Sequence, residues 1–212
     1  MKFTCLIPVY NTRAHHLIEC VNSIINQTLP PNEILIIDDG STSKETIDAL
    51  ELIEFNTKCQ ILKLPENGGT SVALNYGHLN AKHDWIAVMG SDDIAFPNRF
   101  EMQMNYIKRN PKIHVLGTGL FAFYDDDPMR RPIFRKSHPE HITEMHGKWV
   151  CNHGTAIYNR SILIKVNGYD TKLRRGQDVD FWYRIFNAGF IIRNIPDILY
   201  AYRRYNNTNQ KS

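Results

Sequence analysis

Two adjacent carboxylates follow an apolar run near the middle of the chain. The run Trp85–Met89 is short and apolar, which is typical of a strand buried on both faces. Gly90-Ser91 comes next and then Asp92 and Asp93, and two anions beside a buried strand cost free energy unless a cation or hydrogen-bond donors lie next to them. A divalent metal that carries a phosphorylated ligand would satisfy them, because Mg²⁺ and Mn²⁺ prefer such oxygen ligands. The alternative is a solvated turn, in which Asp is also common.

Polar residues also follow two other predicted strands. Phe3–Val9 predicts a first buried strand, which ends in Pro8-Val9-Tyr10-Asn11. Ile34–Ile37 predicts a second strand, which continues into Asp38-Asp39-Gly40-Ser41. In an open parallel sheet a ligand binds outside the carboxyl ends of the strands, where the strand order reverses. These polar strand ends and Asp92-Asp93 are therefore expected to converge on one crevice.

The segments between these strands have the apolar spacing of helices. Helices are predicted over Leu17–Ile25, about 43–54, Thr70–Leu79 and about 97–107, with a further strand at Gln60–Leu64. Alternation of strands and helices at this spacing predicts an α/β fold with a mostly parallel sheet and right-handed crossovers.

Composition excludes several classes of function. The chain has 212 residues, 42% of them hydrophobic and 22% charged, with a net charge of +3. This charge is too small to indicate a nucleic-acid partner. The four cysteines lack CxxC spacing, which argues against a zinc site. A strand directly at the amino terminus and the lack of an apolar run of about 18 residues lead us to expect a cytoplasmic protein without an integral membrane segment, peripheral at a membrane if its acceptor is lipid-linked.

Two common nucleotide motifs are missing. No G-x-G-x-x-G follows the first predicted strand, and no G-x-x-x-x-G-K-[ST] occurs in the chain. A nucleotide site here would therefore depend on carboxylates and a metal.

Several short motifs, in this order, resemble a family 2 glycosyltransferase of the GT-A fold over nearly the whole chain. They are Ile7–Asn11, Ile36–Thr42, Glu66–Gly69, Ser91–Asp93, His153–Thr155, Gly168–Asp170, Gln177–Arg184 and Tyr202-Arg203. The resemblance implies a single GT-A domain over residues 1–212. Its nucleotide-binding half would cover about 1–110, and a smaller, partly antiparallel acceptor-binding half about 111–212.

The resemblance also implies a site for a UDP-sugar. Asp39 would accept a hydrogen bond from the imide N–H of uracil, which favours UDP over purine nucleotides. The other expected nucleotide contacts are Pro8, Tyr10 and Asn11 beside the base, Asn67 and Gly68 closing its pocket, and Asp92 at the ribose or the metal. Asp93 would bind the Mn²⁺ or Mg²⁺ ion that bridges the two phosphates. Asp38 either contacts the nucleotide or only caps the following loop.

The chain departs from the family pattern at two positions. The family often has Asp-x-Asp-Asp where this chain has Gly90 in place of the first Asp, and Tyr205 lies where a histidine often occurs. Asp125-Asp126-Asp127 is a second acidic run, but it follows the aromatic strand Leu120–Tyr124 and precedes Pro128, which predicts a solvated turn.

The second half is expected to bind the acceptor. Residues from about Asp125 to Lys148 are polar and show no clear period, which predicts a mobile flap or loop. Its histidines match no helical metal pair and are expected to be solvated; they are His138, His141 and His146. The segment Trp149–Tyr158 is expected to return to the sheet. His153 within it is either near the reaction centre, as the resemblance implies, or a partly buried, hydrogen-bonded histidine.

A helix is predicted over Gln177–Gly189, with Asp178 in its first turn. The helix dipole favours an ionised carboxylate there, as a general base requires, although such a residue can also serve only as a favourable first-turn charge. The resemblance implies that Asp178 is the base and that Asp180 and Arg184 form a supporting ion pair. Gln177, Arg203 and His153 are expected on the acceptor or phosphate side.

The sequence thus predicts an inverting glycosyltransferase that moves a sugar from UDP to an acceptor hydroxyl of a glycan or polysaccharide. A nucleotidyltransferase is an alternative, but it would need a basic, Gly-rich loop after the first strand, and Pro8–Arg13 is not one. A non-catalytic sugar-nucleotide or glycan-binding module is another. It would not need a base at Asp178.

Overall fold

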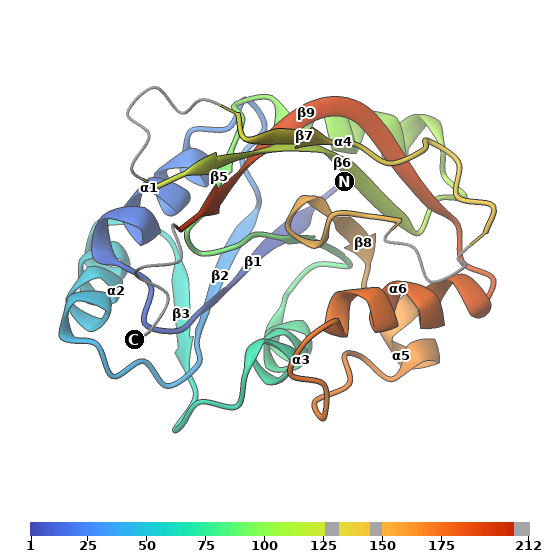
Figure 1. Cartoon of the computed structure of the whole chain (residues 1–212). Helices are drawn as coiled ribbons and strands as arrows, with labels where there is room; N and C mark the ends of the chain where they lie inside the picture. The colour runs from blue at the N-terminus through green and yellow to red at the C-terminus, as the bar shows by residue number, and fades with distance from the viewer. Residues whose placement is uncertain (126–131, 145–149, 206–212) are drawn as a thin grey trace.

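The computed structural model describes residues 1–125, 132–144 and 150–205. These residues form one nine-stranded sheet in the order β3-β2-β1-β4-β8-β6-β9-β5, with β7 paired to β6 (Figure 1). The sequence order reverses beside β1, because β2 lies on one side of it and β4 on the other. A ligand site is expected at such a point.

The first half of the sheet is parallel, as predicted. Its strands are β1 (Phe3–Val9), β2 (Glu33–Asp38), β3 (Gln60–Lys63) and β4 (Trp85–Val88). The helices that connect or follow them are α1 (Ala14–Ile25), α2 (Lys44–Asn56), α3 (Thr70–Asn80) and α4 (Arg99–Arg109). Every strand and helix predicted in this half is present, and most boundaries agree to within two residues.

The second half is mixed. Its strands are β5 (Ile94–Ala95), β6 (Val115–Tyr124), β7 (Phe134–Lys136), β8 (Ile157–Asn159) and β9 (Ile192–Arg204). The short 3₁₀ turn η1 (His153–Thr155) precedes β8, and the helices are α5 (Ile162–Val166) and α6 (Gln177–Asn187). β8 runs antiparallel to both β4 and β6, whereas β6 and β9 are parallel. In Figure 1, β6, β7 and β9 lie together at the top of the view, and α5 and α6 lie together near the end of β8.

The period of two along β1 divides the core between the two faces of the sheet. Phe3, Cys5 and Ile7 pack on one face with residues of α1, α2 and α4. Leu6 packs on the other face with residues of α3, α5 and α6. A strand that is apolar on both faces is what its sequence predicts.

The prediction of a loop after Asp125 is wrong in part. Phe134–Lys136 forms β7, whose partner is the middle of β6, and His138 is half-buried with Nε2 3.1 Å from Oδ1 of Asn152. His141 is largely exposed, as predicted. A three-residue strand shows no recognisable period, so pairing with β6 decides its structure. Residues 126–131 and 145–149, and with them Asp126, Asp127 and His146, lie outside the described residues.

Candidate active site

Two cavities open at the carboxyl ends of the parallel strands. The smaller has a volume of about 240 Å³ and is lined by Tyr10, Asp39, Asn67, Gly68, Gly69, Thr70, Ser71, Thr171, Leu173, Arg174 and Gln177. The larger, of about 540 Å³, is lined by residues of β4, β7, β9, η1 and α6. Thr70, at the start of α3, lines both cavities. One elongated ligand could therefore pass from one cavity to the other beside this helix end.

Asp39 organises the smaller cavity. Its side chain is buried, with 3% of the residue exposed, and its two oxygens accept hydrogen bonds from the backbone N–H groups of Gly68 (2.9 Å) and Gly69 (2.8 Å). The amide of Asn67 donates to it as well, at 3.2 Å. N–H donors stabilise a buried carboxylate, and each carboxylate oxygen can accept a further hydrogen bond. Asp39 is thus an anchored acceptor at the edge of a cavity lined by Tyr10.

Asp92 and Asp93 lie in the larger cavity. Oδ1 of Asp93 accepts from the backbone N–H of Arg203 at 2.7 Å, and Oδ2 accepts from the Tyr200 hydroxyl at 2.6 Å. Oδ2 of Asp92 accepts from the Tyr205 hydroxyl at 2.8 Å. Burial, and next the neighbouring Asp92 carboxylate, raise the pKa of Asp93 to about 8; burial also raises the pKa of Asp92. Asp93, which is buried, and Asp92, which is half-buried, both have a raised pKa and form a donor set that a divalent cation would stabilise.

Gly90 is explained by the packing of Tyr200. A Cβ atom at position 90 would lie 2.4 Å from Oδ2 of Asp93, and the backbone N–H of Gly90 donates to the Tyr200 hydroxyl at 3.0 Å. Gly154 is restricted in the same way, since its Cβ would lie 2.4 Å from that hydroxyl. In this chain the Tyr200–Asp93 contact fills the space that a side chain at position 90 would need.

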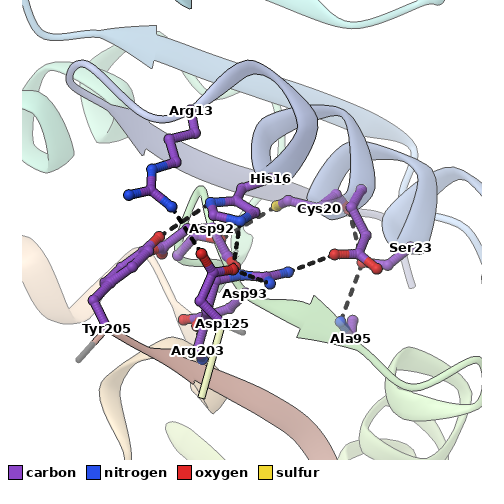
Figure 2. Close-up of polar contacts among 12 residues, drawn as sticks. Arg13, His16, Cys20, Ser23, Asp92, Asp93, Ala95, Asp125, Arg203 and Tyr205 are labelled. Atoms are coloured by element: carbon purple, nitrogen blue, oxygen red, sulfur yellow. Dashed lines mark hydrogen bonds and ion pairs between the residues drawn. The ribbon is translucent and has the colours of Figure 1, made fainter. Parts of the chain in front are cut away.

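A polar cluster braces the two carboxylates from the side of α1 (Figure 2). The buried guanidinium of Arg203 bonds to the backbone oxygen of Asp92 and pairs with Asp125 and Glu19. Asp125 also pairs with Arg13 at 2.8 Å. Asp125 is therefore not the solvated turn residue that the sequence predicts: it is held by two guanidinium groups that come from elsewhere in the chain.

His15, His16 and Asp125 form a group whose potential ligand atoms lie within 4.8 Å of one another. Nε2 of His16 is 2.6 Å from Oδ1 of Asp125, and burial, together with the Arg203 cation, lowers the pKa of His16 to about 4. Both oxygens of Asp125 already contact arginines. A cation at Asp125 would face these two positive charges, which disfavours a metal there.

Asp178 lines the larger cavity together with the two carboxylates and lies in the first turn of α6. Gly176, with a φ of 71°, precedes the helix, and this left-handed conformation favours glycine. The predicted pair of Asp180 and Arg184 is confirmed, with Nη2 of Arg184 2.7 Å from Oδ2 of Asp180. The pair also holds the chain before Gly168, because Nη1 of Arg184 bonds to backbone carbonyls at Val166 and Gly168. Asp178 therefore has a fixed helix to project from.

The two cavities bring together most of the residues predicted from sequence. Tyr10, Asp39, Asn67, Gly68 and Gln177 line the smaller, and Pro8, Asp92, Asp93, His153 and Asp178 line the larger.

Asn11 and Arg203 do not line either cavity. Oδ1 of Asn11 accepts from the backbone N–H groups of Thr42 and Ser43, so this residue joins the ends of β1 and β2. Asp38 accepts from the N–H of Ser41 at 2.9 Å, which agrees with its loop-capping interpretation.

Sequence reasoning missed Tyr200, Tyr202 and Arg204, which line the larger cavity from β9. The strand period of two puts these three side chains on one face and Arg203 on the other, so the alternation was a usable signal. Lys136 and Phe134 on β7, and Arg174 before α6, also line the cavities. They lie in segments that show no period and gave no such signal.

Comparisons with known proteins identify the family. The family model of glycosyl transferase family 2 matches residues 4–166. An uncharacterized glycosyltransferase of Haemophilus influenzae is 33% identical over 215 residues, which cover 98% of this chain and 77% of that protein. The chain belongs to the family 2 glycosyltransferases. As a member of that family it is an enzyme of sugar transfer.

Further relatives and solved structures agree with this assignment. The amylovoran biosynthesis glycosyltransferase AmsE of Erwinia amylovora is 29% identical over 95% of this family 2 chain and 76% of its own. An Escherichia coli UDP-Gal:alpha-D-GlcNAc-diphosphoundecaprenol beta-1,3-galactosyltransferase is 26% identical over 93% of this chain and 72% of its own. The structure of S. aureus TarS 1–349 in complex with UDP-GlcNAc has a TM-score of 0.78 and 20% identity, and it covers 96% of this chain and 59% of TarS 1–349. The likeness to TarS shows that the two chains share an α/β fold. This chain spans little more than half of TarS 1–349. Among the described residues, no helix has the length and apolarity needed to cross a membrane.

Proposed function

We propose that this family 2 glycosyltransferase moves a sugar from a UDP-sugar to an acceptor hydroxyl with inversion at the anomeric carbon. The observation that carries the proposal is the pair of cavities that share Thr70, with Asp39 anchored in one and Asp92, Asp93 and Asp178 all lining the other. The smaller cavity offers contacts for a nucleobase. The larger offers Asp92 and Asp93 to bind a cation and Asp178 to accept a proton.

The smaller cavity would hold the uracil. Asp39 would accept the imide N–H, with Tyr10 stacked on the ring and Asn67 and Gly68 closing the pocket. Guanine and adenine are larger and present a different edge to Asp39. Two proteins support UDP as the nucleotide: the Escherichia coli relative is named as a UDP-Gal enzyme, and TarS 1–349 is described in complex with UDP-GlcNAc.

Asp92 and Asp93 would hold a divalent cation, Mn²⁺ or Mg²⁺, in the larger cavity. Family 2 enzymes generally use such a metal, and the two oxygen donors fit it because they are buried, close together and hard to ionise without a cation. When bound, the ion would neutralise the negative charge that develops on the leaving diphosphate. Tyr200, Tyr205 and the backbone of Arg203 would hold the carboxylates in place.

Asp178 would act as the general base. It would take the proton from an acceptor hydroxyl while the oxygen of that hydroxyl bonds to the anomeric carbon, and the bond from that carbon to the diphosphate oxygen breaks. UDP leaves with the electron pair of that bond. One displacement with one base inverts the configuration.

The acceptor would enter the larger cavity past Phe134 and Tyr202, whose rings are part-exposed, and past Lys136 and Arg204. Aromatic faces and cations of this kind suit a glycan or a phosphorylated, lipid-linked sugar. AmsE and the diphosphoundecaprenol-dependent relative are named for acceptors or products of this class. We therefore place the enzyme in polysaccharide biosynthesis.

The test is the variant Asp178→Asn, which keeps the size of the side chain but cannot accept a proton at neutral pH. We expect kcat to fall by about 10²–10⁴-fold while the affinity for UDP barely changes, because general base catalysis contributes about this much. Tyr183→Phe, on the same helix and outside both cavities, is a matched control. Full activity in Asp178→Asn, or a product with retained configuration, would contradict the mechanism.

A further inference from the structure

Four side chains form a buried hydrogen-bonded chain that ends at the larger cavity. Nε2 of His78 is 2.6 Å from the Tyr158 hydroxyl, which is 3.2 Å from the Tyr169 hydroxyl. The Tyr169 hydroxyl is in turn 2.8 Å from Nε2 of His153. His78, Tyr158 and Tyr169 are buried, and His153 lines the cavity together with Asp178. We call these four residues the His78–His153 chain.

The number of protons limits this chain to two arrangements. Burial lowers the pKa of His78 to about 3 and also lowers the pKa of His153, so both imidazoles are neutral at pH 7. Each of the four groups then has one proton to donate and three contacts need one each, so one group keeps a spare proton. A spare proton on Tyr158 or Tyr169 would leave a buried hydroxyl without an acceptor, which is costly, so the spare proton lies on a histidine. Either every proton points from His78 towards His153, which leaves His153 with its remaining proton on Nδ1, or every proton points the other way.

The two ends of the chain select the first arrangement. At the His78 end, Nδ1 is buried without a hydrogen-bond partner among the described residues. The reverse arrangement would leave an N–H group there unpaired, and orphaned buried N–H groups are rare. The Arg160 guanidinium also lies at that end, where it donates to the backbone oxygen of His78 at 3.3 Å. At the other end lies the Asp178 carboxylate. A positive charge behind the chain and a negative charge in front of it both drive the protons towards the cavity.

We propose that the His78–His153 chain fixes His153 as the Nδ1–H tautomer and that His153 donates this N–H to the Asp178 carboxylate once the acceptor is bound. In the structure itself the two side chains are not hydrogen-bonded; they line the same cavity, and Asp178 acts on His153 through its charge. In the complex one oxygen of Asp178 would be held, and the other would be left for the acceptor hydroxyl. His153 and Tyr169 are positioning residues, since His153 acts through Asp178 and Tyr169 acts through His153. The catalytic part of this proposal rests on the proposed function, while the tautomer does not.

The packing around Tyr169 allows its hydroxyl to be removed cleanly. Its ring stacks on Phe181 with the centroids 3.9 Å apart and the planes at 26°, so Tyr169→Phe keeps this contact. The substitution removes the hydroxyl that donates to His153 and accepts from Tyr158, and so breaks the chain at this point. Tyr106→Phe is the matched control, because the Tyr106 hydroxyl donates to Glu140 on the exposed side of α4.

The direct test is the tautomer of His153, measured by long-range ¹H–¹⁵N correlation spectra of the ¹⁵N-histidine-labelled protein without nucleotide. We expect a proton on Nδ1 and an unprotonated Nε2 in the wild type. His114 is an internal reference of the opposite tautomer, because its Nδ1 accepts from the N–H of Ile191 at 3.2 Å. Tyr169→Phe should alter the His153 signals, and Tyr106→Phe should not. A wild-type His153 protonated on Nε2, or averaged between the two tautomers, would overturn the proposal.

Kinetics test the positioning role. Loss of one hydrogen bond in Tyr169→Phe should lower kcat by about threefold to tenfold with KM little changed. The same substitution should have no further effect in an Asp178→Asn background, because the role runs through Asp178. An equal loss in both backgrounds would refute the positioning role. If Asp178→Asn itself is fully active, the proposed base is wrong, and the spectra still decide the tautomer.

Discussion

Asp39 and Asp93 both follow buried parallel strands, and both are almost fully buried, but their surroundings differ. Asp39 accepts hydrogen bonds from three N–H donors of the turn before α3, and no second carboxylate is bonded to it among the described residues. Asp93 lies beside Asp92, and burial and this neighbour raise its pKa to about 8. At Asp39 the protein supplies three N–H donors to the carboxylate. At Asp93 burial and the neighbouring carboxyl group oppose ionisation instead.

This difference indicates how the two cavities bind their ligands. The cavity at Asp39 is complete in the protein alone, so a nucleoside should bind there without a metal. The other cavity presents the two carboxyl groups of Asp92 and Asp93 to its ligand, so a diphosphate should bind beside them only with a divalent cation. The predictions below test each side of this comparison.

The largest effect is expected from Asp93→Asn. Removal of one negative oxygen from the cation site should lower the Mn²⁺-dependent part of UDP affinity by at least about tenfold to 100-fold, since even indirect partners of metal ligands contribute this much. Titration calorimetry of UDP with and without Mn²⁺ measures it. Uridine affinity should not change, and Asp125→Asn should retain the Mn²⁺ effect. If Asp125→Asn abolishes the effect and Asp93→Asn does not, the cation binds near His15, His16 and Asp125 instead.

Asp39→Asn should have a smaller effect on the other side of the comparison. The variant keeps one oxygen acceptor but loses the charge, so uridine affinity should fall by about tenfold, the difference between a charged and a neutral hydrogen bond. The preference for UDP over GDP should weaken with it. The loss should be the same with and without Mn²⁺, and a loss that appears only with Mn²⁺ would place Asp39 in the cation site.

The smallest effect concerns the pH dependence of stability in the metal-free protein. In the folded state Asp93 keeps its proton up to about pH 8, whereas in the unfolded chain it loses the proton near pH 4. The folded state therefore binds more protons between these values, and its free energy of unfolding should fall as the pH rises from about 4 to 8. Urea unfolding at pH 5 and pH 8, with a chelator, measures the slope. Asp93→Asn should make the slope less negative; an unchanged slope would show that Asp93 ionises normally.

The parts that sequence could predict are those in which local pattern and final structure agree. The strands Phe3–Val9 and Trp85–Val88 are apolar on both faces, and the polar groups that follow them meet at the switch point, as the topology requires. Asp39 and Asp93 were therefore predictable as cavity residues. The motifs of the family supplied their roles and brought Asp178 into the site.

The parts that sequence missed depend on contacts across long distances in the chain. Asp125 was predicted to be solvated because it follows the strand Leu120–Tyr124 in an acidic run that ends at Pro128, but Arg203 and Arg13 reach it from other elements. Gly90 was interpreted as the loss of an acidic group, and only the position of Tyr200 shows why a side chain does not fit there. Arg203 was predicted as a site residue from the Tyr202-Arg203 motif. The strand period of two would have indicated Arg204, which lines the larger cavity.

The central claim is that the nucleobase cavity at Asp39 binds its ligand without a metal, whereas the diphosphate cavity at Asp92 and Asp93 needs one. It is tested most directly by thermal-shift measurements of the wild type with uridine, UDP and GDP, each with and without Mn²⁺, since a ligand that binds the folded state raises its melting temperature. We predict that uridine raises Tm equally in both conditions, that UDP raises it further only with Mn²⁺, and that GDP raises it less than UDP. Equal shifts for UDP and GDP, or a UDP shift independent of Mn²⁺, would contradict the account.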